Sequence, residues 1–479
     1  MRNLTLLTDL YQLTMMNGYF KKNLHKREAV FDIFFRKNGL ITYSLAAGLE
    51  TAVDYVLNIN FGKEEIEYLR SLKLFDEEFL AYLKDFKFTG DISAVEEGTV
   101  VFPSEPILTV KAPVIEAQLI ETALLNIIDH QTLIATKAAK VCHAAAGGEV
   151  MEFGLRRAQG PDAGIDGARA AVIGGCSSTS NVLSGQKYGI PVKGTHSHSW
   201  VMNFKDEYTA FKAYADIYPH ACMLLVDTYD TLKSGVPNAI KVFDELKAAG
   251  YKPIGIRLDS GDLAYLSKKA REMLDGAGYP DAIICASGDL DEYSIQSLKN
   301  QGAKIDLWGV GTKLITSEGM PSLGGVYKMA AIYDESGREI PKIKISDNSA
   351  KITNPCYKSL YRIYDKSGKA QADLITLREE KIDESKPLTI FHPEEIWKKT
   401  TFTDYSVKSL QKDIIKGGKL VYELPALSQI KAKAEAELDS FWEEYKRLEQ
   451  PQIYKVDLSD KLYAVKDKML KSIRGEERL

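Results

Sequence analysis

The sequence predicts an α/β protein whose central part is an irregular, TIM-like α/β barrel. Two observations support this prediction. Short apolar runs recur between residues 149 and 312, and amphipathic helical segments that end in glycine separate several of them, as at 237–250 and 262–278. Strands that alternate with helices in this way form parallel βα units, and a long series of units favours a closed or nearly closed barrel. The runs are EVMEFG (149–154), IGGCSS (173–178), IPVKGT (190–195), ACMLLVDT (221–228), PIGIRLDS (253–260), AIICASGD (282–289) and DLWGVGT (306–312).

The residues on either side of the barrel follow other patterns. Residues 92–112 predict short strands separated by Gly and Pro turns, and a helical pattern follows to about Gly147. After Lys328 the sequence predicts strands and hairpins, then a Lys/Glu-rich helix and a second helix near the C-terminus. We therefore expect three parts: a discontinuous α+β N-terminal domain (1–140, completed by 330–385), the barrel (141–329) and a C-terminal helical extension (386–479).

The composition is that of an ordinary globular protein. Hydrophobic residues make up 45% and charged residues 27% of 479 residues, and the net charge is −4. This balance gives no indication of binding to nucleic acid or to an anionic membrane. The five widely spaced cysteines favour reduced thiols in a cytoplasm. Asp9 interrupts the N-terminal apolar run, and no run of 18 apolar residues occurs, so neither a signal peptide nor a membrane span is expected.

Polar or glycine residues follow each predicted strand. In a parallel barrel, the carboxyl ends of the strands meet at one mouth, which carries the active site. Two late strand ends, SGDLD (287–291) and GVGTK (309–313), are rich in glycine. Loops at this position in barrels often hold a phosphate with backbone N–H groups, which makes phosphate-binding candidates of Gly288, Asp289, Gly309, Gly311 and Thr312.

The segment RLDSGDL (257–263) places an arginine beside two acids. One of its polar residues is expected to cap the next helix. An arginine at a strand end also suits a carboxylate or a phosphate, because its planar fork donates two parallel hydrogen bonds. Arg257 and Asp259 are therefore candidate site residues, with the acid holding the arginine, a ribose hydroxyl or Mg²⁺.

Two of the seven histidines lie in GTHSHSW (194–200). The pattern alone leaves three interpretations open for His196 and His198: a shared metal ion, a nucleophile or acid–base catalyst, or two packing residues. A working histidine needs an orienting partner. Asp227 ends the next predicted strand and so is expected beside this loop, where a carboxylate would raise the pKa and the nucleophilicity of the ring.

Many motifs, in order along the chain, resemble one family. They are TDLYQLTM (8–15), EFGLRRAQGPD (152–162), SSTSNVLSGQKYGIPVKGTHSHSW (177–200), LLVDTYDT (224–231), IRLDSGDL (256–263), WGVGTKLIT (308–316), KITNPCYKSLYRIYD (351–365) and GGKLVYELPAL (417–427). Together they resemble the nicotinate phosphoribosyltransferases. The resemblance implies a type II phosphoribosyltransferase, a homodimer whose site is shared across the interface. The implied reaction joins nicotinate to phosphoribosyl pyrophosphate, with coupled ATP hydrolysis and with Mg²⁺, whose ligands we do not assign.

The resemblance also implies catalytic roles for single residues. His198 matches the histidine that ATP transiently phosphorylates, and Asp227 matches the acid that holds it. Together with Arg257 and Asp259, the candidates from RLDSGDL, these two residues form the predicted catalytic set. His196 falls where relatives usually carry an apolar residue, so the resemblance gives it no role.

Further residues match contacts to the substrates. Thr195 and Arg257 match contacts to nicotinate, and Thr312 matches a contact to the phosphoribosyl group. Tyr11 matches a tyrosine that reaches in from the partner subunit. Phe153 matches the aromatic residue that lies opposite this tyrosine. Arg156 matches a residue that lies beside the phosphate and the pyrophosphate.

The choice of the pyridine substrate is predicted from Asn181 and Arg257. The relative that acts on nicotinamide uses an aspartate to accept from the amide, and SNVLSG (180–185) aligns Asn181 with it. Asparagine can donate to a carboxylate, and Arg257 adds the opposite charge, so the acid is favoured over the amide. The alternatives are a nicotinamide phosphoribosyltransferase and a non-catalytic pyridine-nucleotide-binding protein, although no catalytic residue is missing.

Overall fold

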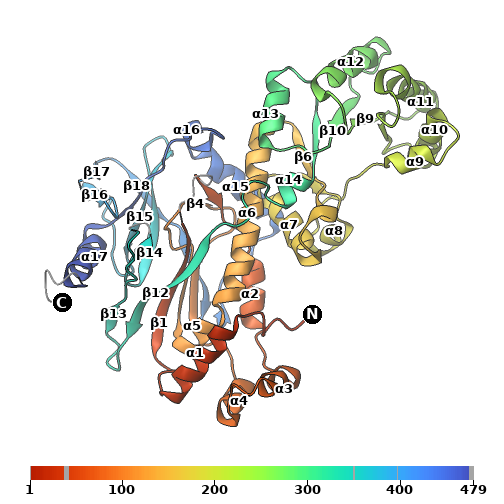
Figure 1. Ribbon diagram of the computed structural model, residues 1–479. Helices are drawn as coiled ribbons and strands as arrows, with labels where there is room; N and C mark the ends of the chain where they lie inside the picture. The colour runs from red at the N-terminus through yellow and green to blue at the C-terminus, as the bar shows by residue number, and fades with distance from the viewer. Residues whose placement is uncertain (1, 37–41, 349–350, 396, 474–479) are drawn as a thin grey trace. The chain divides into compact units, whose positions relative to one another are not determined.

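The computed structural model describes residues 2–36, 42–348, 351–395 and 397–473 (Figure 1). The chain forms two compact units. One consists of Met1–Leu133 with Ser322–Leu479, and the other of Ile134–Pro321. The division falls within eight residues of the expected boundaries at 140/141 and 329/330. Nowhere in the described ranges does a helix have the length and apolar character needed to cross a membrane.

The unit Ile134–Pro321 is built on a sheet of six parallel strands, in the order β7-β6-β11-β10-β9-β8. Five of the seven predicted runs contain a strand, and a sixth, IGGCSS, overlaps β7 only at Ser178, so the predicted α/β class with a parallel sheet is confirmed. The seventh, IPVKGT, forms only an isolated parallel bridge, from Val192 to Thr179 of β7. Pro191 has no N–H to donate to a ladder, which shortens this strand. The strands are β6 (Glu149–Glu152), β7 (Ser178–Thr179), β8 (Met223–Leu225), β9 (Gly255–Leu258), β10 (Ile283–Ala286) and β11 (Leu307–Val310).

Helices follow these strands, and acids cap several of their first turns. Asp262 accepts the N–H of Tyr265 at the start of α12, which identifies the cap expected in RLDSGDL. Asp291 and Ser294 form a reciprocal capping box on α13. The helical segments are η1 (Leu155–Arg157), α7 (Pro161–Ile173), α8 (Val182–Tyr188), α9 (His198–Met202), α10 (Glu207–Ile217), η2 (Thr231–Gly235), α11 (Val236–Ala248), α12 (Leu263–Gly276), α13 (Glu292–Asn300) and α14 (Thr312–Ile315).

The other unit joins the two ends of the chain in one sheet, ordered β13-β12-β1-β5-β3-β19-β20. Strand β1 (Glu28–Phe35) pairs antiparallel with β5 (Leu108–Pro113) and with β12 (Gly325–Tyr333), which follows the barrel in sequence (Figure 1). A second sheet has the order β17-β16-β21-β15-β14-β18. The N-terminal strands thus depend on residues far beyond the barrel.

The remaining elements of this unit include many short strands after residue 386. They are α1 (Leu10–Lys21), β2 (Ser44–Leu45), α2 (Leu49–Leu57), α3 (Lys63–Ser71), α4 (Glu77–Lys84), β3 (Asp91–Val95), β4 (Val100–Val101), α5 (Val114–Leu119), α6 (Glu121–Ala145, which continues into the other unit), β13 (Glu339–Pro341), β14 (Lys358–Tyr364), β15 (Ala370–Leu377), β16 (Leu388–Phe391), β17 (Lys399–Phe402), β18 (Ser406–Ser409), β19 (Gln411–Lys416), β20 (Lys419–Leu420), α15 (Leu427–Asp439), α16 (Glu443–Lys446), β21 (Val456–Leu458) and α17 (Asp460–Ile473).

The expected helical extension over 386–479 is therefore corrected. Strands β16 to β21 lie in this range, and β19 pairs with β3 in the N-terminal sheet. Several of these strands are short and largely exposed, for example KTTF in β17 and SVKS in β18. A strand with few buried residues lacks a clear hydrophobic alternation, so its sequence is hard to distinguish from a polar loop.

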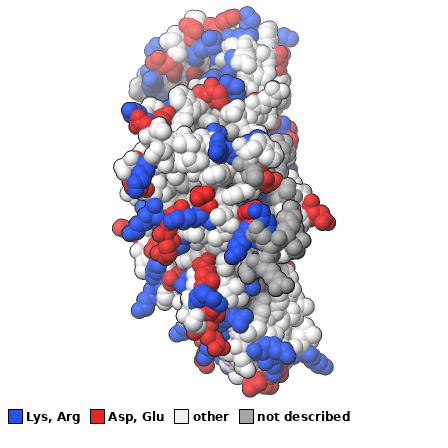
Figure 2. Space-filling view, turned by 90° about the vertical axis from the view of Figure 1, so that its left-hand side faces the viewer, with Lys and Arg blue, Asp and Glu red and all other residues white. Residues whose placement is uncertain are grey.

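A buried ionic network fastens the C-terminal strands to the N-terminal part of the unit. Arg362 of β14 has no exposed side-chain surface and makes a bidentate contact with Asp373 of β15, at 2.8 and 2.7 Å. Its other N–H groups reach Glu437 of α15 at 2.7 Å and the carbonyl oxygen of Val100 in β4 at 2.6 Å. On the face shown in Figure 2, by contrast, basic and acidic side chains are interspersed on the surface.

Asp129 of α6 gives this unit a predicted pH dependence. Its Oδ2 accepts the N–H of Gly325 at 3.1 Å, and burial raises the pKa of Asp129 to about 7. The unfolded chain releases this proton near the ordinary pKa of 3.8, whereas the folded chain keeps it, so stability falls as pH rises from about 4 to 7. Asp129→Asn cannot ionise. Relative to wild type, we expect it to gain up to about 3 kcal/mol between pH 5 and pH 8.

Urea unfolding of both proteins at pH 5 and pH 8 measures this difference. The altered hydrogen bonds of the amide add the same difference in unfolding free energy at both pH values, so only the change of that difference from pH 5 to pH 8 tests the assignment. A difference in unfolding free energy that does not change with pH would contradict it.

Candidate active site

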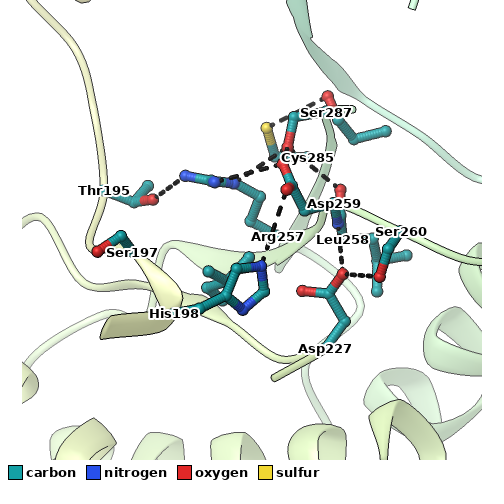
Figure 3. A network of polar contacts seen from close by, with 12 residues as sticks. Thr195, Ser197, His198, Asp227, Arg257, Leu258, Asp259, Ser260, Cys285 and Ser287 are labelled. Carbon is teal, nitrogen blue, oxygen red and sulfur yellow. Dashed lines mark hydrogen bonds and ion pairs between the residues drawn. The ribbon is translucent and has the colours of Figure 1, made fainter. Parts of the chain in front are cut away.

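Side chains from neighbouring strand ends of the parallel sheet converge on one network (Figure 3). Arg257 lies in β9, and Asp259 follows that strand directly. Asp227 comes just after β8, Ser287 follows β10, and His198 is the first residue of α9. The convergence agrees with the expectation that the carboxyl ends of parallel strands share one mouth.

Arg257 is held by three partners. Its Nε donates to Ser287 Oγ at 3.1 Å, Nη1 donates to Thr195 Oγ1 at 2.6 Å, and Nη2 lies 3.4 Å from Asp259 Oδ1. A guanidinium has five N–H groups, so two remain for a ligand. The arginine side chain is only 15% exposed, and its fixed fork is suited to a planar carboxylate.

The carboxylate that faces the His198 ring is Asp259. Nε2 of His198 lies 3.8 Å from Asp259 Oδ2, and Nδ1 lies 3.1 Å from Thr228 Oγ1. The first distance is too long for a hydrogen bond. The predicted direct pairing of His198 with Asp227 is thus corrected, because residue order along the strands does not reveal which neighbouring carboxylate turns toward the ring.

Asp227 instead fixes the turn that carries Asp259. Its Oδ2 accepts the N–H of Asp259 at 2.9 Å and the hydroxyl of Ser260 at 2.7 Å. Its Oδ1 is buried and has no hydrogen-bond partner among the described residues. A buried carboxylate oxygen without a partner is costly in isolation, so this atom is positioned to serve a ligand.

Asp259 is ionised at neutral pH. Burial acts to raise its pKa, but the hydrogen bond from Ser287 and the positive charge of Arg257 outweigh burial and lower the pKa overall. Ser287 thus bridges Arg257 and Asp259. Sequence reasoning named neither Ser287 nor Thr228 as a site residue, although Ser287 directly follows one apolar run and Thr228 comes one residue after another.

The glycine-rich strand ends are required by packing within the barrel. Gly288 has φ +92°, and a Cβ there would lie 2.1 Å from the carbonyl oxygen of Asp259. A Cβ on Gly309 would lie 2.7 Å from the ring of Phe153, and one on Gly311 would lie 3.0 Å from the carbonyl oxygen of Phe153. These contacts explain the glycines without a ligand, so phosphate binding by Gly288, Gly309 and Gly311 stays a prediction.

The other predicted residues are placed as follows. Phe153 packs against the cluster formed by Met151, Met223, Cys285 and Leu307. Arg156 is exposed in η1, Asp289 has φ +42°, and Thr312 begins α14. Tyr11 lies on α1 of the other compact unit, 49% exposed, with its hydroxyl 3.4 Å from Glu121. Its predicted role across a subunit interface stays a prediction.

Asn181 is not an open substrate contact in this structure. It is the N-cap of α8, and its side-chain oxygen accepts the N–H of Ser184 at 3.2 Å. Its amide nitrogen donates to the carbonyl oxygen of Gly164 at 3.1 Å, and the residue is 2% exposed. A residue that follows a strand can equally cap the next helix. The expected contact of Asn181 with the substrate is thus corrected.

The two histidines of GTHSHSW separate. His198 is 39% exposed at its side chain, whereas His196 is 7% exposed and its Nε2 accepts the N–H of Leu225 at 3.3 Å. Within the described ranges, no group of three or more His, Cys, Asp and Glu side chains is gathered as for a metal ion. The shared-metal interpretation of this pair has no support, and His198 is the candidate for chemistry.

Known proteins resemble the chain along most of its length. Family models for the N-terminal domain, the family and the C-terminal domain of nicotinate phosphoribosyltransferase match residues 6–129, 149–373 and 357–466. The chain is 47% identical to nicotinate phosphoribosyltransferase of Bacillus subtilis, over 100% of this chain and 98% of the relative.

Solved structures agree with the sequence comparison. The crystal structure of human nicotinic acid phosphoribosyltransferase matches with a TM-score of 0.85 and 29% identity, over 97% of this chain and 99% of that one. Nicotinate-nucleotide pyrophosphorylase from Pyrococcus furiosus has a TM-score of 0.70 at 22% identity, over 90% and 94%, and shares the fold. The chain therefore belongs to the nicotinate phosphoribosyltransferase family.

Proposed function

We propose that the protein transfers the phosphoribosyl group of phosphoribosyl pyrophosphate to nicotinate, giving nicotinate mononucleotide and pyrophosphate, as a step of NAD biosynthesis. The observation that carries the proposal is the fixed fork of Arg257 beside Thr195, with two N–H groups left for a carboxylate. The coupling of this transfer to ATP hydrolysis, through phosphorylation of His198, is a further part of the proposal.

The transfer requires positioning more than proton chemistry. The pyridine nitrogen of nicotinate has a free lone pair, so it can attack the anomeric carbon without a general base. The fork of Arg257 would hold the carboxylate of nicotinate, and the ring of Phe153 would offer an apolar wall to the flat pyridine. Fixing the ring in line with the anomeric carbon converts a bimolecular reaction into an effectively unimolecular one.

His198 is suited to accept a phosphoryl group. When Nδ1 donates its proton to Thr228, Nε2 carries the free lone pair and faces Asp259 (Figure 3). In the proposed step, Nε2 bonds to the γ-phosphorus of ATP, the bond to the bridging oxygen breaks, and ADP leaves. Phosphohistidine then transfers its phosphoryl group to water, which releases inorganic phosphate.

The residues present fit a divalent cation bound with the substrates. Mg²⁺ is commonly held by one or two carboxylates together with phosphate oxygens and water. Asp259 is ionised, and Asp227 keeps a buried Oδ1 without a partner among the described side chains. These two acids would hold the ion, which supplies neutralisation of the phosphate charges that the carboxylates would otherwise repel.

We also propose that the enzyme is a cytoplasmic homodimer with a shared site. All five cysteines are free thiols, in keeping with a reducing compartment. Tyr11 lies beside the exposed apolar residues Leu7 and Leu10 at the start of the chain, at 38% and 51% exposure. Exposed apolar side chains this close together in the sequence are suited to contact with a second subunit.

Replacing Arg257 tests the choice of nicotinate. Lysine keeps the positive charge but lacks the planar fork. We expect Arg257→Lys to lower kcat/KM for nicotinate by about 10- to 100-fold, mainly through KM, because a charge-assisted pair contributes about 1.5–3 kcal/mol. Steady-state kinetics with nicotinate and with nicotinamide measure the effect. An equal loss for both substrates would contradict a carboxylate-specific role.

A further inference from the structure

His196 lies in the loop that carries the candidate nucleophile, yet the hydrogen bonds of its ring go to Ser197 and Leu225 and not to the network around Arg257. Its ring is buried against Tyr214, with 4.8 Å between ring centroids in an edge-on arrangement, and against Phe211 at 6.0 Å. Both aromatic residues belong to α10. The neighbouring residues Thr195 and His198 instead contact Arg257, Thr228 and Asp259.

The acceptor role of His196 follows from the geometry of the sheet edge. Strand β8 is the last strand in the order of the described sheet. Val226 donates its N–H to the carbonyl oxygen of Arg257 in the neighbouring strand, β9. Because successive N–H groups of an extended strand point to opposite sides, the N–H of Leu225 points toward the open edge. Leu225 is fully buried, so its N–H needs a partner there.

The His196 ring supplies that partner. Nε2 lies 3.3 Å from the Leu225 nitrogen, and Nδ1 lies 3.4 Å from the carbonyl oxygen of Ser197. A proton on Nδ1 leaves Nε2 as the acceptor. Burial lowers the pKa of His196 to about 4, so the ring remains neutral and able to accept throughout the neutral range.

The hydrogen bond from the Leu225 N–H to His196 connects the loop that leaves one edge of the parallel sheet with the strand at the other edge. At one edge, residues 191–193 extend the sheet beside β7, with Lys193 donating its N–H to the carbonyl oxygen of Thr179 at 3.0 Å. At the other edge is β8. Three residues after Lys193, the ring of His196 accepts the backbone N–H of Leu225 in β8. The loop is therefore fixed at its centre, between Thr195 and His198.

We propose that His196 is a positioning residue, which sets the place of His198 by holding the N–H of Leu225 at the open edge of the barrel sheet. The catalytic consequence rests on the proposed function of His198, whereas the bond itself does not. Loss of the bond should slow the reaction rather than abolish it.

Two substitutions distinguish the loss of the hydrogen-bond acceptor Nε2 from the loss of the packing of the His196 ring. His196→Leu fills much of the space but offers no acceptor, and His196→Gln restores an oxygen near the position of Nε2. In His196→Leu we expect the Leu225 amide to exchange at least about tenfold faster. We expect kcat with ATP, and the rate of His198 phosphorylation, to fall about tenfold. KM for nicotinate should change less, because Ser287 and Asp259 still hold Arg257.

His196→Gln should recover the slow exchange and most of kcat, even if its melting temperature is as low as that of the leucine variant. Amide exchange resolved at Leu225, kcat, KM and melting temperature are measured on all three full-length proteins. Wild-type exchange and kcat in His196→Leu would overturn the proposal, as would equal impairment of the two variants. If the wild-type protein made no nicotinate mononucleotide, the proposed function would fail, and the exchange comparison would still decide whether His196 holds Leu225.

Discussion

His198→Ala is expected to lose all stimulation of phosphoribosyl transfer by ATP, while it keeps its fold and a slow basal transfer. The side chain is 39% exposed at the mouth of the sheet, so its removal opens no buried cavity. The proposed phosphoryl acceptor is Nε2, and no second histidine can take its place because Nε2 of His196 is occupied by Leu225. Incorporation of labelled phosphate from γ-labelled ATP should fall by about a thousandfold or more.

His220→Ala is the matched control for this experiment. His220 precedes β8 and so lies at the opposite end of the strand from Asp227, with its ring 5.0 Å from that of Tyr251. This variant should keep both ATP stimulation and label incorporation at wild-type levels. Nicotinate mononucleotide formation with and without ATP is measured on both variants. Full coupling in His198→Ala would refute the assignment of the phosphohistidine.

Arg362→Met is expected to destabilise the unit that contains both chain ends by about 3–5 kcal/mol. Methionine fills much of the volume of the arginine, but Asp373 would lose its ion pair with Arg362 while buried, and Glu437 would keep only Lys408, whose Nζ lies 3.8 Å from its Oε1. Removing one partner of a buried pair leaves an uncompensated charge, which costs far more than the pair contributes. Urea unfolding monitored by circular dichroism measures the change.

Two other variants distinguish this buried network from ordinary surface charge. Arg338→Met removes an ion pair with Asp334 whose arginine side chain is 77% exposed, and it should change stability by less than about 1 kcal/mol. Glu105→Gln tests a third acid, Glu105, which is buried and shares a hydrogen bond with Asp373. Burial, and then the charge of Asp373, raises the pKa of Glu105 well above its usual value, so a neutral amide should be tolerated. Arg362→Met with wild-type stability would contradict the account.

The elements with regular hydrophobic patterns could be predicted from sequence. The runs around β6, β8, β9, β10 and β11 are buried from both sides, and continuous apolar stretches with polar ends identify them. The same strand order located the network of Arg257, Asp259 and His198. The strands after residue 386 were missed because several are short and largely exposed, which leaves no clear period to detect.

The partners of individual side chains could not be predicted from sequence. Asp227 and Asp259 both end strands beside the loop of His198, and only the folded backbone decides that Asp259 faces the ring. Asn181 follows β7 as a substrate contact would, but its side chain caps α8. The packing of Gly309 against Phe153 likewise depends on two strands far apart in sequence.

The most direct test of the account is formation of mononucleotide by the purified protein. Nicotinate or nicotinamide is supplied with phosphoribosyl pyrophosphate and Mg²⁺, each with and without ATP, and the product is quantified. The account predicts product from nicotinate, more product when ATP is present, and little from nicotinamide, which offers Arg257 no negative charge. Equal or greater product from nicotinamide, or no response to ATP, would contradict it.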